Sequence, residues 1–258
     1  MAKIISTHSF RGGTGKSNTT ANIAVLVAKA GNRVGVIDTD IQSPGIHVLF
    51  QLAESRVKHA LNDYLWGKCS IRDAAYDVTT AAIGDVDPDE DRPRIFLIPS
   101  SVNTGEISRV LREGYDVARL NDGFQQIVRE LKLDYLFIDT HPGVNEETLL
   151  SIAISDLLLL VMRPDNQDFQ GTAVTAELAR RLEVKKMLLL VNKVPPSMDR
   201  EALCQKVEEL YKVEVASVLP LNEEIVNVAS SAIFTNRYPN HPFTRALQQV
   251  VDKILAIE

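Results

Sequence analysis

The sequence predicts an α/β fold: a doubly wound, mostly parallel sheet of about seven or eight strands with helices on both faces. Short apolar runs alternate with amphipathic stretches along all 258 residues. Most of these runs are apolar at consecutive positions, as strands buried between two helix layers must be. Because strands and helices alternate, the strands are expected to be joined by right-handed crossovers.

The apolar runs and the amphipathic stretches give the expected elements in order. Strands are expected at 3–8, 33–39, 95–99, 135–139, 157–162, 187–192 and 215–219. Helices are expected at 16–30, 53–66, 104–113, 117–131, 146–155, 168–182, 200–210, 223–230 and 243–256. The sequence contains no internal repeat or linker, so residues 1–258 are expected to form a single domain. Ligands of such sheets bind at the carboxyl ends of the strands.

Composition restricts the class of protein. The hydrophobic content of 45% is enough for a core, and the net charge of −6 argues against a protein that coats nucleic acid through its overall charge. Cys69 and Cys204 are far apart, which excludes a CxxC metal site and a disulfide framework and fits a reducing cytosol. The first residues read as a strand rather than a signal peptide, and the run 157–162 is too short to span a bilayer. We therefore expect a cytoplasmic protein.

The glycine loop, residues 10–17, is the strongest functional motif. It reads FRGGTGKS and lies between an expected strand and an expected helix. Such a loop surrounds a phosphate chain with backbone N–H groups, and the helix N-terminus adds partial positive charge. Lys16 is expected to neutralise the outer phosphates and Ser17 to ligate Mg²⁺. The expected nucleotide-binding residues here are Gly12, Gly13, Thr14, Gly15, Lys16, Ser17 and Asn18.

The loop departs from the general phosphate-binding pattern at its start. That pattern requires glycine at position 10, where this chain has Phe10, followed by the basic Arg11. The loop resembles the deviant Walker A box, K-G-G-x-G-K-[ST], of the ParA/MinD family of ATPases. The resemblance implies that Arg11 reaches the nucleotide of a second subunit, where its planar fork suits two phosphate oxygens. The alternative is that Arg11 contacts its own loop or a neighbouring carboxylate.

Acidic residues follow two of the expected strands. Asp38 and Asp40, two positions apart, lie on the same face of an extended chain. The family resemblance implies that Asp40 orients the water that attacks the γ-phosphate and that Asp38 supports the metal. Asp139 ends an apolar run in the Walker B manner and is expected to hold Mg²⁺ through a water, opposite Ser17. The alternative for Asp38 and Asp40 is an ordinary solvated loop.

The residues after Asp139 match the form D-x-x-P-G, with Pro142 and Gly143, that leads into the family's second switch segment. Gly143 is a candidate for a backbone contact with the γ-phosphate. His141 stands between them, and we favour a solvent-facing or packing role for it over a catalytic or pH-sensing one.

Two later segments resemble the family's base-binding residues. Asn192 ends an expected strand, and an amide can pair with two edges of adenine. Pro220 and Asn222 lie in a segment like the one that covers the adenine ring in the family. The alternatives are that Asn192 caps a turn and that Pro220 ends a strand.

The resemblance covers residues 3 to about 256 and implies an ATP- and Mg²⁺-dependent dimerisation switch. In this family a homodimer sandwiches ATP, binds a surface and hydrolyses ATP slowly until an activating protein partner arrives, and such cycles position cellular cargo. The last residues lack the basic amphipathic tail of MinD, so membrane binding of that type is not expected. Nonspecific DNA is a candidate partner, although surface charges more often serve solvation. The candidate DNA contacts are Arg180, Arg181, Lys185, Lys186, Arg200, Lys206 and Lys212.

Other classes fit less well. Iron–sulfur relatives need cysteines near the dimer axis, and Cys69 and Cys204 lie outside the expected positions. Tyrosine autokinases end in a tyrosine-rich tail that is absent here. A small-molecule ligase or kinase on the same scaffold, similar to dethiobiotin synthetase, remains the main alternative. The acidic segment 82–94 is interpreted as a solvated surface loop rather than a partner-specific one.

Overall fold

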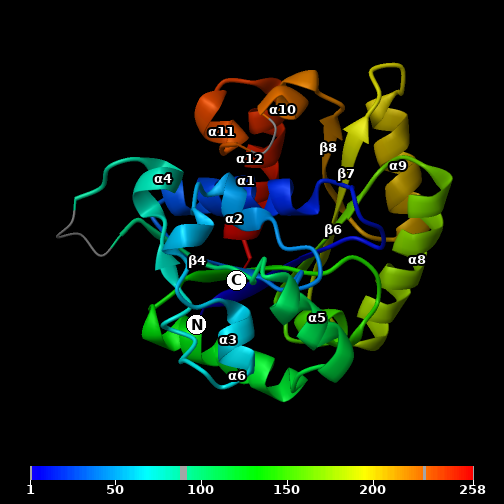
Figure 1. The fold of residues 1–258 in the computed structure, drawn as a ribbon. Helices are drawn as coiled ribbons and strands as arrows, with labels where there is room; N and C mark the ends of the chain where they lie inside the picture. Colours follow the sequence, from blue (N-terminus) through cyan, green and yellow to red (C-terminus); the bar gives the residue numbers. More distant parts are fainter. Residues whose placement is uncertain (1, 88–91, 229–230, 258) are drawn as a thin grey trace.

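One eight-stranded sheet organises the molecule (Figure 1). The computed structural model describes residues 2–87, 92–228 and 231–257. The strands lie in the order β3-β4-β2-β5-β1-β6-β7-β8, and every neighbouring pair is parallel except β3 and β4. The strands are β1 (Lys3–His8), β2 (Arg33–Asp38), β3 (Tyr76–Asp77), β4 (Arg94–Ile98), β5 (Tyr135–Asp139), β6 (Leu157–Met162), β7 (Met187–Val194) and β8 (Val215–Pro220).

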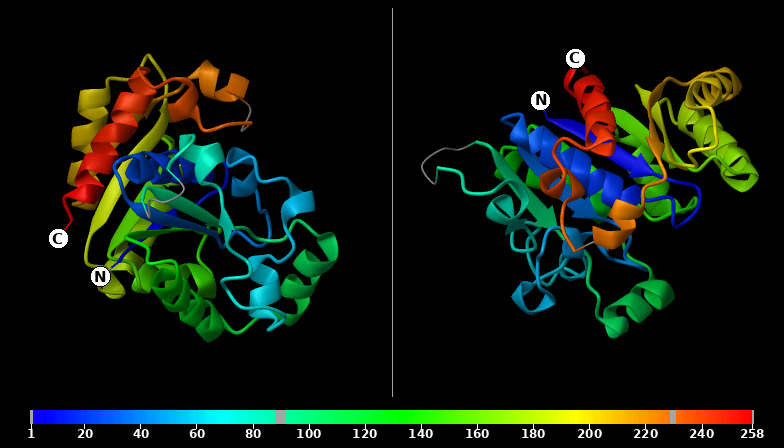
Figure 2. Two further views of the ribbon diagram at one scale, coloured as in Figure 1. Left: turned by 90° about the vertical axis from the view of Figure 1, so that its left-hand side faces the viewer. Right: turned by 90° about the horizontal axis from the view of Figure 1, so that it is seen from above.

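Helices cover both faces of this sheet (Figure 2). One layer, together with the sheet, buries the largest core cluster and contains α1 (Lys16–Lys29), α2 (Ile46–Leu49), α4 (Thr79–Ile83), α11 (Phe234–Arg237) and α12 (Pro242–Leu255). The opposite layer buries two further clusters and contains α3 (Leu61–Leu65), α5 (Thr104–Glu113), α6 (Val117–Glu130), α7 (Glu146–Ala153), α8 (Asn166–Arg181) and α9 (Arg200–Tyr211). Helix α10 (Glu223–Val228) follows β8.

The strands are buried from both sides, as their composition requires. Alternate residues of β6 enter different core clusters, with Leu157 and Leu159 facing α1 and α12 and Leu158 and Leu160 facing α8 and α9. Burial of apolar surface at about 25 cal/mol per Å² is the main force that stabilises such layers. The predicted doubly wound α/β fold is therefore confirmed.

The predicted helix at 53–66 is wrong. The chain instead forms a short 3₁₀ turn at Glu54–Arg56 and then α3. The Tyr76 hydroxyl accepts hydrogen bonds from the backbone N–H groups of Lys58 and His59, and the N–H of Leu61 donates to the Pro99 carbonyl. These distant partners take donors that a continuous helix would need, so tertiary contacts override the helical pattern.

Smaller elements were also missed. The two-residue strand β3 and the short helices α2, α4 and α11 have patterns too brief to predict. The acidic segment expected at 82–94 begins inside α4 and ends at β4, and its residues 88–91 lie outside the described residues, as do 229–230 of the helix predicted at 223–230. Among the described residues, none of the helices has both the length and the apolar character needed to cross a membrane.

The topology places the site. The central strands β2, β5 and β1 are neighbours and parallel, so their carboxyl ends open at the same edge of the sheet. From β1 the chain crosses to β2 on one side of the sheet, and from β6 it crosses to β7 on the other side. The carboxyl ends of these central strands are therefore the topological switch point, where ligands of such sheets bind.

Candidate functional site

The glycine loop connects β1 to α1, and its conformation requires glycine at Gly15. Gly15 precedes α1 at φ 93°, and a Cβ there would lie 2.5 Å from the Nδ2 atom of Asn192. Asn192 Nδ2 donates to the Thr14 carbonyl at 2.8 Å, and Lys193 Nζ donates to the Gly13 carbonyl at 2.7 Å. The loop is therefore held from β7, which fixes its backbone before any ligand binds.

Lys16, at the start of α1, points into the sheet edge. Its ammonium lies 2.7 Å from Asp139 Oδ1, and both side chains are almost fully buried. Thr20 Oγ1 donates to the same carboxylate oxygen at 3.2 Å. Lys16 and Asp139 were predicted to bind phosphate and Mg²⁺ separately, whereas here they neutralise each other. Two opposite charges buried this close together are expected to pair, because an isolated buried charge is costly.

The acidic cluster consists of Asp38, Asp40 and Asp139. Asp38 and Asp139 end neighbouring strands in register, and Asp38 is fully buried. Burial first, and then the Asp139 charge, raises the pKa of Asp38 to about 8. Its carboxylate accepts hydrogen bonds from the N–H groups of Asp40 at 3.0 Å and Gly45 at 3.3 Å. The three predicted carboxylates are thus brought together at one edge.

The donor set can be tested against Mg²⁺. Ser17 follows Lys16 in the first turn of α1, and Lys16 contacts Asp139 of the acidic cluster. Within the described residues no group of three or more His, Cys, Asp or Glu side chains could hold a metal ion alone. One or two carboxylates, a hydroxyl and substrate phosphates are the set that Mg²⁺ usually takes. The residues therefore fit a magnesium ion that arrives with a nucleotide.

His141 was not expected at the site. It follows Asp139 by two positions, and its Nδ1 lies 2.7 Å from Asp40 Oδ1. The side chain is 22% exposed and contacts the acidic cluster, and whether its role is packing or catalytic stays a prediction. A sequence signal for this contact existed, because Asp40 and His141 each stand two residues beyond the paired Asp38 and Asp139.

Arg11 binds carboxylates of its own chain. Its Nη1 lies 3.4 Å from Asp165 Oδ1 and 3.4 Å from Asp168 Oδ1, and about a third of its side chain is exposed. This is the contact that the alternative interpretation expected. Phe10 packs beside it on α8, where a Cβ at Gly171 would lie 2.1 Å from the Phe10 ring. The loop and α8 are therefore joined at the position where the general pattern has glycine.

A cavity of about 260 Å³ lies beside the glycine loop, between β7 and α10, and we call it the β7–α10 cavity. It is lined by Gly15, Asn18, Asn192, Lys193, Pro220, Leu221, Asn222, Ile225, Val226 and Phe243. The structure thus brings the predicted Asn192, Pro220 and Asn222 to the loop. Asn192 keeps further hydrogen-bonding capacity, since within the described residues Nδ2 donates one hydrogen bond and Oδ1 accepts one. Lys193 was missed, and its left-handed φ of 58° has no sequence signal.

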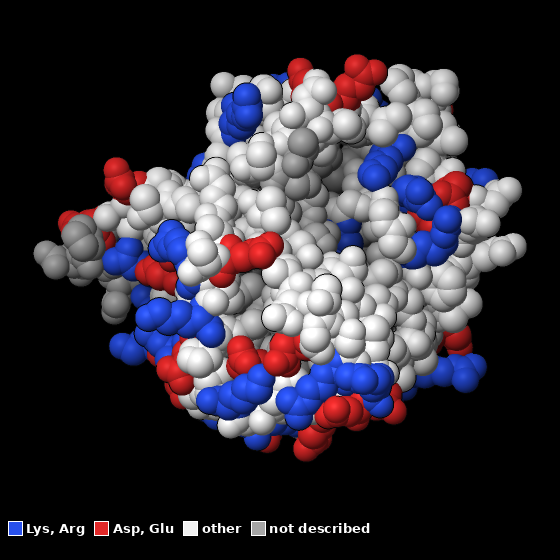
Figure 3. Space-filling model, in the orientation of Figure 1, with Lys and Arg blue, Asp and Glu red and all other residues white. Residues whose placement is uncertain are grey.

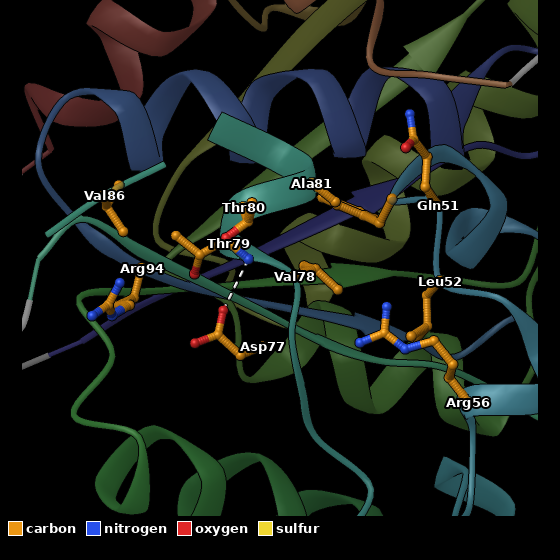
Figure 4. Close-up of a pocket in the computed structure, with 11 residues that line it drawn as sticks. Gln51, Leu52, Arg56, Asp77, Val78, Thr79, Thr80, Ala81, Val86 and Arg94 are labelled. Atoms are coloured by element: carbon orange, nitrogen blue, oxygen red, sulfur yellow. Dashed lines mark hydrogen bonds between the residues drawn. The ribbon is translucent and has the colours of Figure 1, made fainter. Parts of the chain in front are cut away.

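Other features lie outside this edge. A pocket of about 360 Å³ near β3 and α4, where Asp77 accepts from the Thr79 N–H at 2.9 Å, contains none of the predicted site residues (Figure 4). Charged residues of both signs crowd the lower rim of the face in Figure 3. Several candidate DNA contacts are already engaged: Arg181 with Glu177, Lys185 with Asp156, and Lys206 over Phe169. DNA binding stays a prediction.

Characterised and uncharacterised proteins resemble this chain over most of its length. An uncharacterised ATP-binding protein of Methanocaldococcus jannaschii is 28% identical over 256 residues, covering 99% of this chain and 88% of that protein. The septum site-determining protein MinD of Synechocystis is 24% identical over 88% of this chain and 79% of its own length. A relative named for a role in septum placement can thus be aligned with most of this chain.

Solved structures share the fold. The cell division ATPase MinD of Pyrococcus furiosus superposes with a TM-score of 0.82 at 20% identity, covering both chains completely. MinD of Pyrococcus horikoshii, complexed with Mg-ADP, gives 0.79 at 19% identity over 98% of this chain and 96% of its own. The family model described as "ParA: NUBPL iron-transfer P-loop NTPase" matches residues 1–255. The chain therefore belongs to the ParA family of P-loop NTPases, as its glycine loop indicated.

Proposed function

We propose that this chain is an ATP-hydrolysing switch that forms a homodimer on ATP and positions a cellular cargo. One observation carries the nucleotide site: Gly15 and Asn18 of the loop region line the same cavity as Pro220 and Asn222. The glycine loop, which would hold the phosphates, therefore adjoins a cavity of about 260 Å³, which would take the base. The buried Thr14 hydroxyl, which has no hydrogen-bond partner among the described residues, adds a polar group to the loop.

The residues suggest a division of work. Lys16 would exchange Asp139 for phosphate oxygens, which frees Asp139. Ser17, Asp139 and Asp38 would hold Mg²⁺, whose chemistry is to neutralise phosphate charge. Asp40 would orient the attacking water by accepting its hydrogen bond. Catalysis of this kind rests on placement and charge.

Arg11 would act in trans on the partner's nucleotide. It must first leave Asp165 and Asp168, both within 3.4 Å. The pair with Asp165 is partly exposed on both sides, and such pairs contribute about 0–1 kcal/mol. Asp168 is buried, but it would keep Arg163 as its ion-pair partner when Arg11 leaves. The guanidinium can therefore move from its own carboxylates to a stronger, charge-assisted bond with phosphate.

The cellular role is proposed from relatives named for septum placement and cell division. We further propose that residues 1–258 act as one domain in the cytoplasm and that a protein partner stimulates a slow turnover. Iron transfer, named in the family description, is not included, because Cys69 and Cys204 pack in separate clusters.

Solution mass tests the switch. Light scattering would compare wild type, Asp40→Ala and Arg11→Ala with ADP and with ATP plus Mg²⁺. We expect Asp40→Ala to be a dimer with ATP only, and Arg11→Ala to remain monomeric. Lys16→Ala, which removes the phosphate-binding cation, serves as the variant that does not bind nucleotide.

One mass in every nucleotide state would contradict the switch. A small metabolite that raised phosphate release many-fold without a protein partner would then favour the small-molecule kinase or ligase. Nonspecific DNA is tested in the same samples, because a complex with the ATP dimer alone would raise its mass further.

A further inference from the structure

Asp40 and His141 are joined across two loops. Asp40 lies in the segment between β2 and α2, and His141 in the segment between β5 and α7. The distance from His141 Nδ1 to Asp40 Oδ1 is 2.7 Å, and the two side chains are 22% and 12% exposed. An ionised carboxylate only accepts hydrogen bonds, so we assign the proton of this pair to Nδ1. The contact is short and mostly shielded, unlike a surface pair.

Among the described residues, the hydrogen bonds to the Asp40 carboxylate all fall on one of its two oxygens. Oδ1 accepts from His141 Nδ1 and from the Ser43 N–H at 3.2 Å. Within the described residues, Oδ2 accepts no hydrogen bond from the protein. Ser43 orients the carboxylate from its own turn, and His141 orients it from the other loop. The geometry therefore leaves Oδ2 as the oxygen that can accept from a water.

His141 is itself anchored to α7. Its carbonyl accepts a hydrogen bond from Thr148 Oγ1 at 3.3 Å, and Thr148 is fully buried. The N–H of Thr148 donates to Asn145 Oδ1 at 2.9 Å, the side-chain cap at which α7 begins. A displacement of the first turn of α7 would therefore move the imidazole. A path of direct contacts thus runs from a surface helix to the carboxylate.

We propose that His141 is a positioning residue that holds the Asp40 carboxylate in its water-orienting rotamer and couples it to the first turn of α7. This inference rests on the proposed function, since it assigns a partner to the residue that orients the water. A carboxylate free to rotate would present Oδ2 to the water for only part of the time. Orientation of this kind affects the chemical step and leaves nucleotide binding unchanged.

Substitutions of His141 can distinguish a positioning role from a purely structural one. In asparagine, Nδ2 stands on Cγ as Nδ1 does in histidine, so His141→Asn can restore the donor, whereas His141→Ala cannot. Single-turnover phosphate release and ATP affinity would be measured for both variants, for Asp40→Asn and for Asp40→Asn combined with His141→Ala. Thermal unfolding of each protein checks the fold.

We expect His141→Ala to release phosphate about tenfold more slowly with ATP affinity unchanged within about twofold. His141→Asn should recover most of the rate. In the Asp40→Asn background His141→Ala should have no further effect, because the group through which it acts is already gone.

Each other outcome has a distinct meaning. If Asp40→Asn hydrolyses ATP at the wild-type rate, the proposed function fails at Asp40. If Asp40→Asn is slow but His141→Ala is not, the positioning role is overturned and the proposed function stands. Equal losses in His141→Ala and His141→Asn, or a loss of affinity that matches the loss of rate, would show a merely structural histidine.

Discussion

The acidic cluster and the β7–α10 cavity meet at the glycine loop but are built differently. The acidic cluster is buried, and each carboxylate is held by a cation, a histidine or backbone N–H groups. The cavity is lined on one side by exposed apolar residues, with Leu221 50% and Val226 69% exposed. Substitutions in the cluster should therefore reduce both stability and function, whereas substitutions at the cavity rim should reduce only nucleotide affinity.

Removal of the buried cation would test this difference most strongly. In Lys16→Met the Asp139 carboxylate, 1% exposed, would lose its only ion pair among the described residues. Breaking a buried pair from one side typically lowers the free energy of unfolding by about 3–5 kcal/mol. Urea unfolding without nucleotide measures this loss.

The matched control removes both charges. In the double variant Lys16→Met, Asp139→Asn the amide can still accept from Thr20, and most of the lost stability should return. If Lys16→Met were as stable as wild type, the pair would contribute nothing to stability. The proposed difference in stability between the acidic cluster and the cavity would then be contradicted.

The pH dependence of stability offers a second test at the same edge of the sheet. His8 is fully buried, and burial first, then the Lys16 charge, lowers its pKa to about 3. Thr140 Oγ1 donates to the Thr7 carbonyl, so His8 Nδ1 donates to Thr140 Oγ1 at 2.7 Å and the ring is neutral. Below pH 6.5 the unfolded chain binds a proton that the folded chain does not. Stability is therefore lost as pH falls.

The number of protons bound limits how steeply the free energy of unfolding can change with pH. One such proton changes the free energy of unfolding by at most about 1.4 kcal/mol per pH unit. In His8→Asn the amide Nδ2 can replace the Nδ1 donor but cannot titrate. Urea unfolding at pH 7 and pH 5 should show a smaller decrease for the variant, and the other histidines cancel in the difference. Equal decreases would mean that His8 takes up a proton without cost.

The sequence predicted the cluster better than the contacts that hold it. Asp38 and Asp139 follow apolar strands, and parallel strands bring their ends together, so local pattern and topology were enough. The pairing of Arg11 with Asp165 and Asp168 depends on how α8 packs beside the loop, more than 150 residues along the chain. Such contacts depend on tertiary geometry, which no local pattern carries.

The same distinction applies to the fold. The long buried strands and helices were predicted because their periodicity is strong. The helix expected at 53–66 failed because the Tyr76 hydroxyl takes two backbone donors from that segment. The left-handed backbone of Lys193, at φ 58°, is likewise imposed by its neighbours, since lysine has no preference for it.

The smallest expected effect belongs to the cavity. Val226 lines it from α10 and is mostly exposed, so Val226→Ala removes little buried area and should leave the free energy of unfolding within about 0.5 kcal/mol of wild type. ATP affinity should fall about twofold, since two methyl groups of a partly buried contact are lost. Inorganic triphosphate, which has no base, should bind both proteins equally. Calorimetric titration would measure the affinity of both proteins for ATP and for triphosphate. An equal loss of triphosphate affinity would mean that Val226 acts with the phosphate-binding residues, and the proposed division between the two regions would be wrong.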